Sequence, residues 1–240
     1  QPGRYRKRSG TGHSVHFLDE ENEYLRCAMP LLTQPCEQKD FVDWRQGRRY
    51  FAVWALDLDL PDLRQASAEV RAGLAAYWLP GYTRQPHLTI GICGFPGATL
   101  GRADDYGFAH FSAQCQALVA AAPASFCLEI GAPDSFASAA YFSVRDLVGG
   151  IAQLRHILAG EDNDADADAG FVPHVTFGLY QAVLPLPEVL AELRARNPLP
   201  PLRLKVGKLA WMVYEAAVIG GPLLKVGEFD LASGRFEVLA

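Results

Sequence analysis

Two short segments of the chain share one pattern, HLTIG at residues 87–91 and HVTFG at residues 174–178. Each places a histidine, an apolar residue, a threonine, a second apolar residue and a glycine in that order. Because successive side chains of a β-strand point to opposite faces, His and Thr share one face and the apolar residues fill the other. The pattern therefore predicts two strands that each present an imidazole, a hydroxyl and a glycine on the same face.

The repetition makes the pattern informative, since one His-x-Thr on a strand is usually an ordinary sheet segment. With six His and six Thr in 240 residues, chance predicts about 0.15 such tripeptides. The chain has two, each inside an alternating apolar run. We interpret His87, Thr89, His174 and Thr176 as one candidate site to which both halves of the chain contribute.

The sequence around the two motifs predicts alternating helices and strands. We expect strands over 50–58, 87–95, 125–131, 139–145, 171–180, 202–207, 209–215 and 222–230, and helices over 62–79, 105–121, 147–159 and 187–196. The order around the first motif is repeated around the second. It predicts an α+β, bilobal fold with a pseudo-twofold axis, in which two mostly antiparallel sheets backed by helices place the motif strands across a central cleft.

Residues 1–48 differ from the rest of the chain, with a basic start, an acidic patch and little periodicity. We expect an N-terminal extension over 1–48 and a single bilobal domain over 49–240. For the basic arm, a solvated or wrapped tail is favoured over a segment that binds a polyanion.

Composition narrows the classes of partner. Half of the residues are hydrophobic, one fifth are charged, and the formal net charge is −5. A chain with this balance has no overall positive charge that would attract a long nucleic-acid duplex. It remains compatible with a small anionic ligand. No apolar stretch approaches the roughly 18 residues of a membrane helix, and there is no signal-like segment. We expect a cytoplasmic monomer that contacts no membrane.

Cysteines and acidic residues give no pattern typical of a metal site. Five cysteines without paired short spacing argue against a disulfide framework and a zinc site. Cys93 is expected on the motif face beyond Gly91, where packing is favoured over a catalytic thiol. The acidic run 161–168 fails as a calcium loop, because Ala167 and Pro173 stand where glycine and glutamate are required. We expect no metal and no cofactor.

Taken together, these residues resemble the two-histidine (2H) phosphoesterase superfamily, in its 2'-5' RNA ligase-like, RNA 2',3'-cyclic phosphodiesterase branch. The resemblance covers roughly residues 49–231 and rests on both His-x-Thr motifs, on Ile92-Cys93-Gly94 and on the duplicated element order. It implies a bilobal fold and metal-independent chemistry at 2'-linked or cyclic phosphates. Family members often carry a basic residue just after the second motif, where this chain has Leu179-Tyr180.

The resemblance also implies how the site works. One neutral histidine takes a proton from water while the other, protonated, donates to the departing ribose oxygen, and an unperturbed pKa of about 6.5 suits both roles. It implies His87 as the acid and His174 as the base, although a pseudo-symmetric site accepts a ligand either way round. Thr89 and Thr176 would donate hydrogen bonds to the non-bridging oxygens.

Further candidates for substrate binding flank the motifs. Tyr180, expected on the motif face, and Tyr82 are placed to stack on a base or ribose, and sheet packing explains either equally well. Arg84, together with Arg48 and Arg49, is a candidate for the missing positive charge.

The sequence therefore predicts a phosphodiesterase that opens 2',3'-cyclic phosphates of RNA ends or nucleotides to 2'-phosphates. Three alternatives stay open from residue types alone. They are 2'-5' RNA ligase activity, hydrolysis of a small cyclic or 2'-5' signalling nucleotide, and a non-catalytic module that binds RNA ends.

Overall fold

The computed structural model describes residues 31–160 and 170–239. The basic start of the chain and the acidic run 161–168 lie outside these ranges. Leu32–Ala240 forms one unit, which contains both motifs and all the described helices and strands. In the described ranges no helix is long and apolar enough to cross a membrane.

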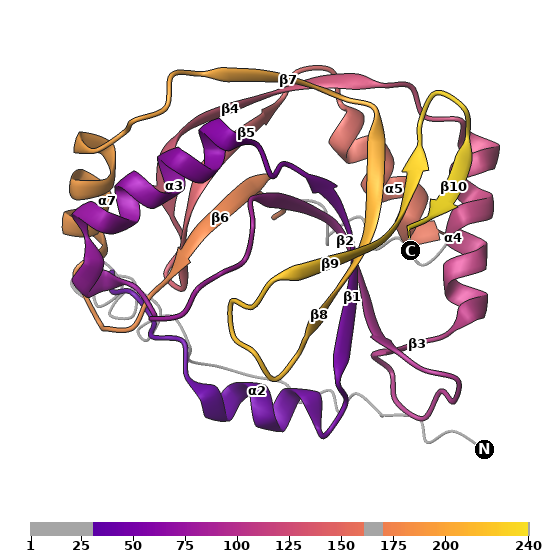
Figure 1. Cartoon of the computed structure of the whole chain (residues 1–240), viewed down its shortest axis with the longest axis horizontal. Coiled ribbons are helices and arrows are strands. Elements are labelled where there is room, and N and C mark those ends of the chain that lie inside the picture. The colour runs from indigo at the N-terminus through magenta and orange to yellow at the C-terminus, as the bar shows by residue number, and fades with distance from the viewer. Residues whose placement is uncertain (1–30, 161–169, 240) are drawn as a thin grey trace, which may run out of the picture. The chain divides into compact units, whose positions relative to one another are not determined.

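Within residues 31–160 and 170–239, the larger of two sheets has six strands in the order β10-β9-β8-β1-β2-β3 (Figure 1). Adjacent strands of this sheet are antiparallel, except β2 and β3, which are parallel. The strands are β1 (Tyr50–Asp57), β2 (His87–Pro96), β3 (Asp105–Tyr106), β8 (Lys208–Glu215), β9 (Leu223–Asp230) and β10 (Arg235–Val238).

The smaller sheet has four antiparallel strands in the order β6-β5-β4-β7. They are β4 (Phe126–Ser135), β5 (Ala139–Asp146), β6 (His174–Leu179) and β7 (Leu202–Val206). The two motif strands, β2 and β6, belong to different sheets and contact each other. The α+β fold of two antiparallel-rich sheets with helices is therefore confirmed.

Helices are α2 (Gln38–Arg45), α3 (Pro61–Gly73), the short 3₁₀ helix Ala75–Tyr77, α4 (Phe108–Ala121), α5 (Gly150–Ala159) and α7 (Leu186–Ala195). Helix α3 starts with a proline in its first turn, where no amide donor is needed, and it buries Leu63, Ala66 and Val70 on one face. Asp146 accepts hydrogen bonds from the backbone amides of Gly149, Gly150 and Ile151 at the start of α5. This carboxylate caps the helix.

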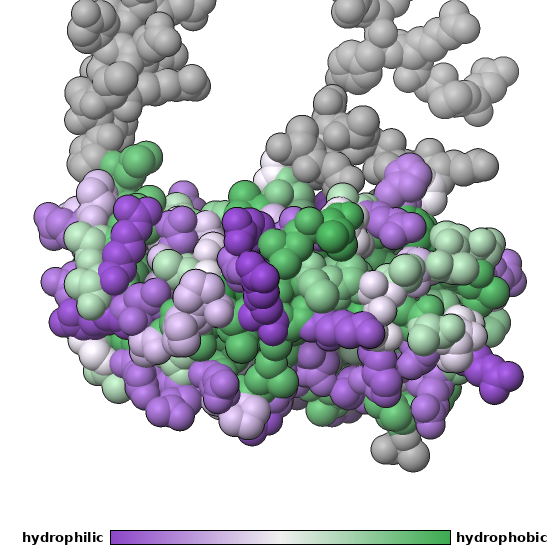
Figure 2. All heavy atoms as spheres, turned by 90° about the horizontal axis from the view of Figure 1, so that it is seen from above, coloured by the Kyte–Doolittle hydropathy of each residue, from purple (hydrophilic) through white to green (hydrophobic). Residues whose placement is uncertain are grey.

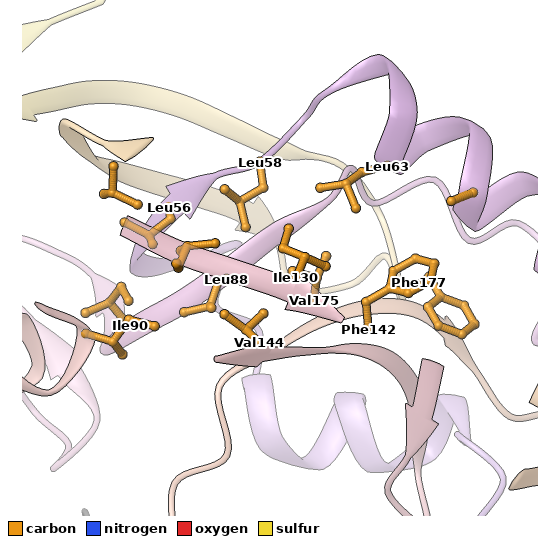
Figure 3. Close-up of a cluster of buried hydrophobic side chains, with 14 of the residues drawn as sticks. Leu56, Leu58, Leu63, Leu88, Ile90, Ile130, Phe142, Val144, Val175 and Phe177 are labelled. Carbon is orange, nitrogen blue, oxygen red and sulfur yellow. The ribbon is translucent and has the colours of Figure 1, made fainter. Parts of the chain in front are cut away.

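The main core lies on the apolar sides of both motif strands. Figure 3 shows side chains from β1, β2, β4, β5 and β6 pointing toward one another, joined by Leu63 of α3. Leu88 and Ile90 of β2 lie in the same cluster as Val175 and Phe177 of β6. Burying each of these side chains stabilises the fold by roughly 1.5 to 3 kcal/mol. The core therefore fixes which face of each motif strand carries the histidine.

Most expected elements are present, and a few boundaries are corrected. The helix expected over 62–79 ends at Gly73, where glycine is a poor helix former, and a 3₁₀ turn follows. The helix expected from 105 begins at Phe108, because residues 105–106 pair with the end of β2 as β3. Helix α2 and strand β10 are not predicted by the sequence patterns.

Each motif contains a β-bulge at its fourth residue. In β2, Thr89 pairs with Ala55 and Gly91 with Trp54, so Ile90 is the extra residue. In β6, Thr176 pairs with Tyr141 and Gly178 with Ala140, which makes Phe177 the extra residue. A bulge reverses the alternation of side chains beyond it.

This reversal corrects the expectation that Gly91 and Gly178 share a face with the motif histidines and threonines. A Cβ on Gly91 would lie 3.2 Å from Leu158, and one on Gly178 would lie 2.8 Å from the Trp78 ring. Both glycines therefore face the core and allow a close approach there. Ile92, which an unbroken alternation from Leu88 and Ile90 would place on the apolar face, is instead 73% exposed. The motif face therefore presents the histidine and the threonine of each motif, but not its glycine.

Part of the expected N-terminal extension packs on the sheets. The backbone amides of Thr33, Gln34 and Cys36 donate hydrogen bonds to the carbonyls of Leu184, Ala137 and Tyr180, respectively. Helix α2 follows, and the Trp44 ring lies 4.7 Å from that of Phe51 and 4.8 Å from that of Phe95. The proposed domain boundary at residues 48 and 49 stays a prediction.

Candidate active site

The two motif histidines occupy the same local setting. Nδ1 of His87 lies 2.9 Å from the carbonyl oxygen of Gln85, and Nδ1 of His174 lies 2.7 Å from that of Val172. A carbonyl oxygen only accepts hydrogen bonds, so each Nδ1 carries the proton and donates it. In the neutral ring this leaves the lone pair on Nε2, which is the state a proton acceptor needs.

The threonines lie on the same faces as the histidines. On the larger sheet His87 pairs with Asp57 and Thr89 with Ala55. On the smaller sheet His174 pairs with Ser143 and Thr176 with Tyr141. Directly paired residues project to one side of a sheet. Each motif therefore presents one imidazole and one half-buried hydroxyl on the side away from the core.

Burial makes the two imidazoles electrostatically unequal. His87 is 9% exposed, and burial lowers its pKa to about 4, with smaller contributions in the same direction from the charges of Arg84 and His174. The strands that carry the two rings contact each other. His174 is less buried, and its ring meets those of Phe136 and Tyr141 edge-on, at 5.0 and 5.4 Å between centroids.

Arg84 and Tyr82 lie in the segment just before β2. The Arg84 guanidinium is 4.1 Å from the Tyr214 ring centroid, and its Nε donates to the carbonyl of Gly221 at 2.9 Å. The Tyr82 hydroxyl donates to the backbone carbonyl of Thr176 at 3.3 Å, and burial raises the pKa of this tyrosine to about 12. The tyrosine is therefore neutral and joins the segment before one motif to the strand of the other.

A cavity of about 280 Å³ adjoins this segment. It is lined by Asp59, which precedes α3, and by residues of α3, of the segment before β2 and of β6: Arg64, Ser67, Ala68, Arg71, Tyr82, Thr83, Arg84, Gln85, Pro86, Thr176 and Phe177. Neither motif histidine lines it. The cavity brings Tyr82, Arg84 and Thr176 to one surface.

Tyr180 does not reach the motif face. It is fully buried in the main core, stacked on Trp78 at 5.4 Å between centroids, and its hydroxyl bonds that of Ser135. The bulge at Phe177 turns it to the core side, so in this structure it is a packing residue rather than one that stacks on substrate. The same effect in β2 packs Cys93 against the core, where burial raises the pKa of its thiol to about 12.

Two other expected arginines hold structural ion pairs. Arg48 bonds the carboxylates of Asp104 and Asp105 and lies over the Phe95 ring. Arg49 pairs with Glu215 at 3.0 Å. Their charges are therefore already matched, and Arg84 is the arginine that lies near His87.

The sequence patterns do not predict the two aromatic rings that contact His174, those of Tyr141 and Phe136. Tyr141 lies in a strand that was predicted, and its place opposite Thr176 follows only from the register of β5 on β6. Phe136 comes from the turn between β4 and β5, and nothing in the sequence places this turn against the motif. Over the described ranges, no group of three or more His, Cys, Asp or Glu residues is arranged to hold a metal ion.

Comparison with protein families decides the classification. A family model described as the 2'-5' RNA ligase superfamily matches residues 82–217, more than half of the chain and both motifs. The chain belongs to the 2'-5' RNA ligase superfamily. The resemblance drawn from the two His-x-Thr motifs is thereby confirmed. A comparison with curated proteins finds no match.

Solved structures of low sequence identity resemble this superfamily member. LigT of E. coli, complexed with NADP+, is 17% identical with a TM-score of 0.44, and the match covers 77% of this chain and 99% of LigT. TT0787 of Thermus thermophilus is 16% identical with a TM-score of 0.48, over 76% of this chain and 98% of that protein. Membership rests on the family model rather than on these matches.

Proposed function

We propose that this protein is a phosphodiesterase that opens the 2',3'-cyclic phosphate of an RNA end or nucleotide to a 2'-phosphate. One observation carries the proposal, the matched pair of imidazoles. His87 and His174 come from two contacting strands, each donates Nδ1–H to a carbonyl two residues earlier, and each leaves Nε2 for proton transfer. A module that only binds nucleotides does not need two histidines set in this way.

The reaction needs one proton accepted and one donated. The water oxygen attacks phosphorus and gives a proton to one Nε2, while the bond between phosphorus and the ribose 3'-oxygen breaks and that oxygen takes a proton from the other Nε2. The products are a 2'-phosphate and a free 3'-hydroxyl. Each acid or base contributes typically 10²- to 10⁴-fold to the rate. Thr89 and Thr176 donate hydrogen bonds to the non-bridging oxygens as their negative charge grows.

The electrostatics favour one division of roles. Because burial lowers the pKa of His87 to about 4, this ring is neutral near pH 7 in the free protein, as a general base must be. We assign His87 as the base and the more exposed His174 as the acid. This is the reverse of the order that the resemblance implies. Arg84 adds positive charge beside His87 and is assigned to hold the phosphate.

Phosphorus NMR on a 2',3'-cyclic nucleotide tests the reaction. Wild-type protein should form the 2'-phosphate, and His87→Asn and His174→Asn should each lower turnover by at least about a hundredfold. His156→Asn, on an exposed position of α5, is the matched control and should keep full turnover. Near-normal turnover by either motif variant, with the fold checked by circular dichroism, would remove that histidine from the mechanism. A 3'-phosphate product would overturn the geometry.

A further inference from the structure

The motif faces of the two sheets differ beyond the histidines. On the larger sheet, β1 presents Phe51, Val53 and Ala55 on the same side as His87, and these residues are buried. Trp44 of α2 packs on this surface against Phe51. On the smaller sheet, the strands that continue away from His174 carry exposed charged residues instead. In the described ranges, the part of the smaller sheet beyond Ser143 is therefore an exposed, charged part of the motif face.

A row of three cations crosses this exposed part of the smaller sheet: Arg145, Arg203 and Lys205. Arg145 lies on β5 two residues beyond Ser143, which pairs with His174, so it shares the motif face. It pairs with Glu129 of β4, and Glu129 pairs in turn with Arg203 of β7. Lys205 follows two residues after Arg203 on the same face. The side chains of Arg145 and Arg203 are 65% and 74% exposed, and Lys205 is exposed as well.

The row carries more positive than negative charge, because its one carboxylate, Glu129, lies among three cations. Glu129 accepts hydrogen bonds from both Arg145 and Arg203, so a single carboxylate is shared by two guanidiniums. Lys205 forms no ion pair within residues 31–160 and 170–239. In a chain whose formal net charge is −5, this local excess favours an anionic occupant rather than general basicity. Figure 2 looks onto the side on which β7 lies in Figure 1, where hydrophilic residues are interspersed with hydrophobic ones.

The spacing of the row suits a nucleic-acid backbone. Two residues along β5 separate the position opposite His174 from Arg145, a distance of about 7 Å, and each further strand adds about 4.8 Å. Successive phosphates of an extended single strand are separated by a similar step. Arginine forks and lysine ammonium groups are the side chains that bind phosphate oxygens. A phosphate held at His174 would therefore place its upstream neighbours over Arg145, Arg203 and Lys205.

We propose that Arg145, Arg203 and Lys205 bind the phosphodiester backbone of the nucleotides that precede the reacting phosphate. The substrate is then the end of an oligonucleotide rather than a free nucleotide. This inference rests on the proposed function and names its substrate class.

The test compares a trinucleotide that ends in a 2',3'-cyclic phosphate with a 2',3'-cyclic mononucleotide. Wild-type protein should prefer the trinucleotide in kcat/KM by at least about tenfold, and Arg203→Gln with Lys205→Gln should lower its kcat/KM about tenfold. The same variant should stay within about twofold of wild type on the mononucleotide, which does not reach the row. The salt dependence of trinucleotide binding should weaken, with a change in log-log slope of about 1.4 for two lost contacts on a single strand.

Arg194→Gln with Arg235→Gln is the matched control, because it removes two exposed positive charges on α7 and β10. Equal losses on both substrates, no preference of the wild type for the trinucleotide, or the same loss in the control would overturn the proposal. If the wild type turns over neither substrate, the proposed function fails. Fluorescence anisotropy with a trinucleotide 3'-phosphate then decides on the row, since unchanged binding by the Arg203 and Lys205 variant would refute it.

Discussion

The buried imidazole of His87 should make the protein lose stability as the pH falls. In the folded state its pKa is about 4, against about 6.5 in an unfolded chain. The folded state therefore binds fewer protons than the unfolded state between these values. Above about pH 6.5 both states are neutral at this position and His87 makes no difference. Below that pH only the unfolded chain gains the proton, so acid favours unfolding.

The size of the effect follows from the two pKa values. One pKa unit corresponds to about 1.4 kcal/mol, so the full difference is about 3 kcal/mol, reached below about pH 4. At about pH 5, where only the unfolded state is substantially protonated, the loss is about 2 kcal/mol. His87→Asn removes the titrating group and keeps a side-chain amide that can donate to the carbonyl of Gln85.

Urea denaturation at about pH 7.5 and pH 5 measures this difference. The free energy of unfolding of the wild type should fall by about 2 kcal/mol more than that of His87→Asn between these values. His156→Asn, which removes an exposed imidazole, should follow the wild type. An equal fall in the wild type and His87→Asn would show that His87 titrates normally and would refute its assignment as the neutral base.

Three further predictions concern the site and the motif strands. On an aryl phosphodiester, whose leaving group needs no proton, His174→Asn should lose far less activity than His87→Asn, and equal losses would contradict the assigned roles. Turnover should survive incubation with excess EDTA, since hydroxyls and imidazoles supply the proposed stabilisation; complete loss restored by a divalent ion would contradict the mechanism. Gly178→Ala should destabilise the fold by about 1 to 3 kcal/mol in urea denaturation, because its Cβ would lie 2.8 Å from the Trp78 ring, and an unchanged midpoint would show that the ring moves aside.

The sequence predicts the framework because apolar alternation marks the strands and repetition marks the site. The two His-x-Thr motifs lie on contacting strands, and the two-sheet fold follows from the duplicated element order. Local patterns do not reveal the bulges at Ile90 and Phe177, because the extra residue is itself apolar and buried. This single omission accounts for the misplaced glycines and for Tyr180.

Features that depend on tertiary contacts are also missing from the sequence patterns. Helix α2 has a weakly apolar composition and depends on Trp44, whose partners Phe51 and Phe95 come from two strands. The low pKa of His87 arises from burial, which a motif does not show. The row of cations alternates with apolar residues along its strands, and only the sheet register unites Arg145 with Arg203.

The pH dependence of kcat/KM on a 2',3'-cyclic substrate tests the acid-base pair most directly. This parameter reports the protonation states of the free protein, in which one histidine must be neutral and the other protonated. The account predicts a bell-shaped profile whose acidic limb lies near the pKa of His87, about 4. A rate that rises monotonically with pH would contradict catalysis by the two histidines.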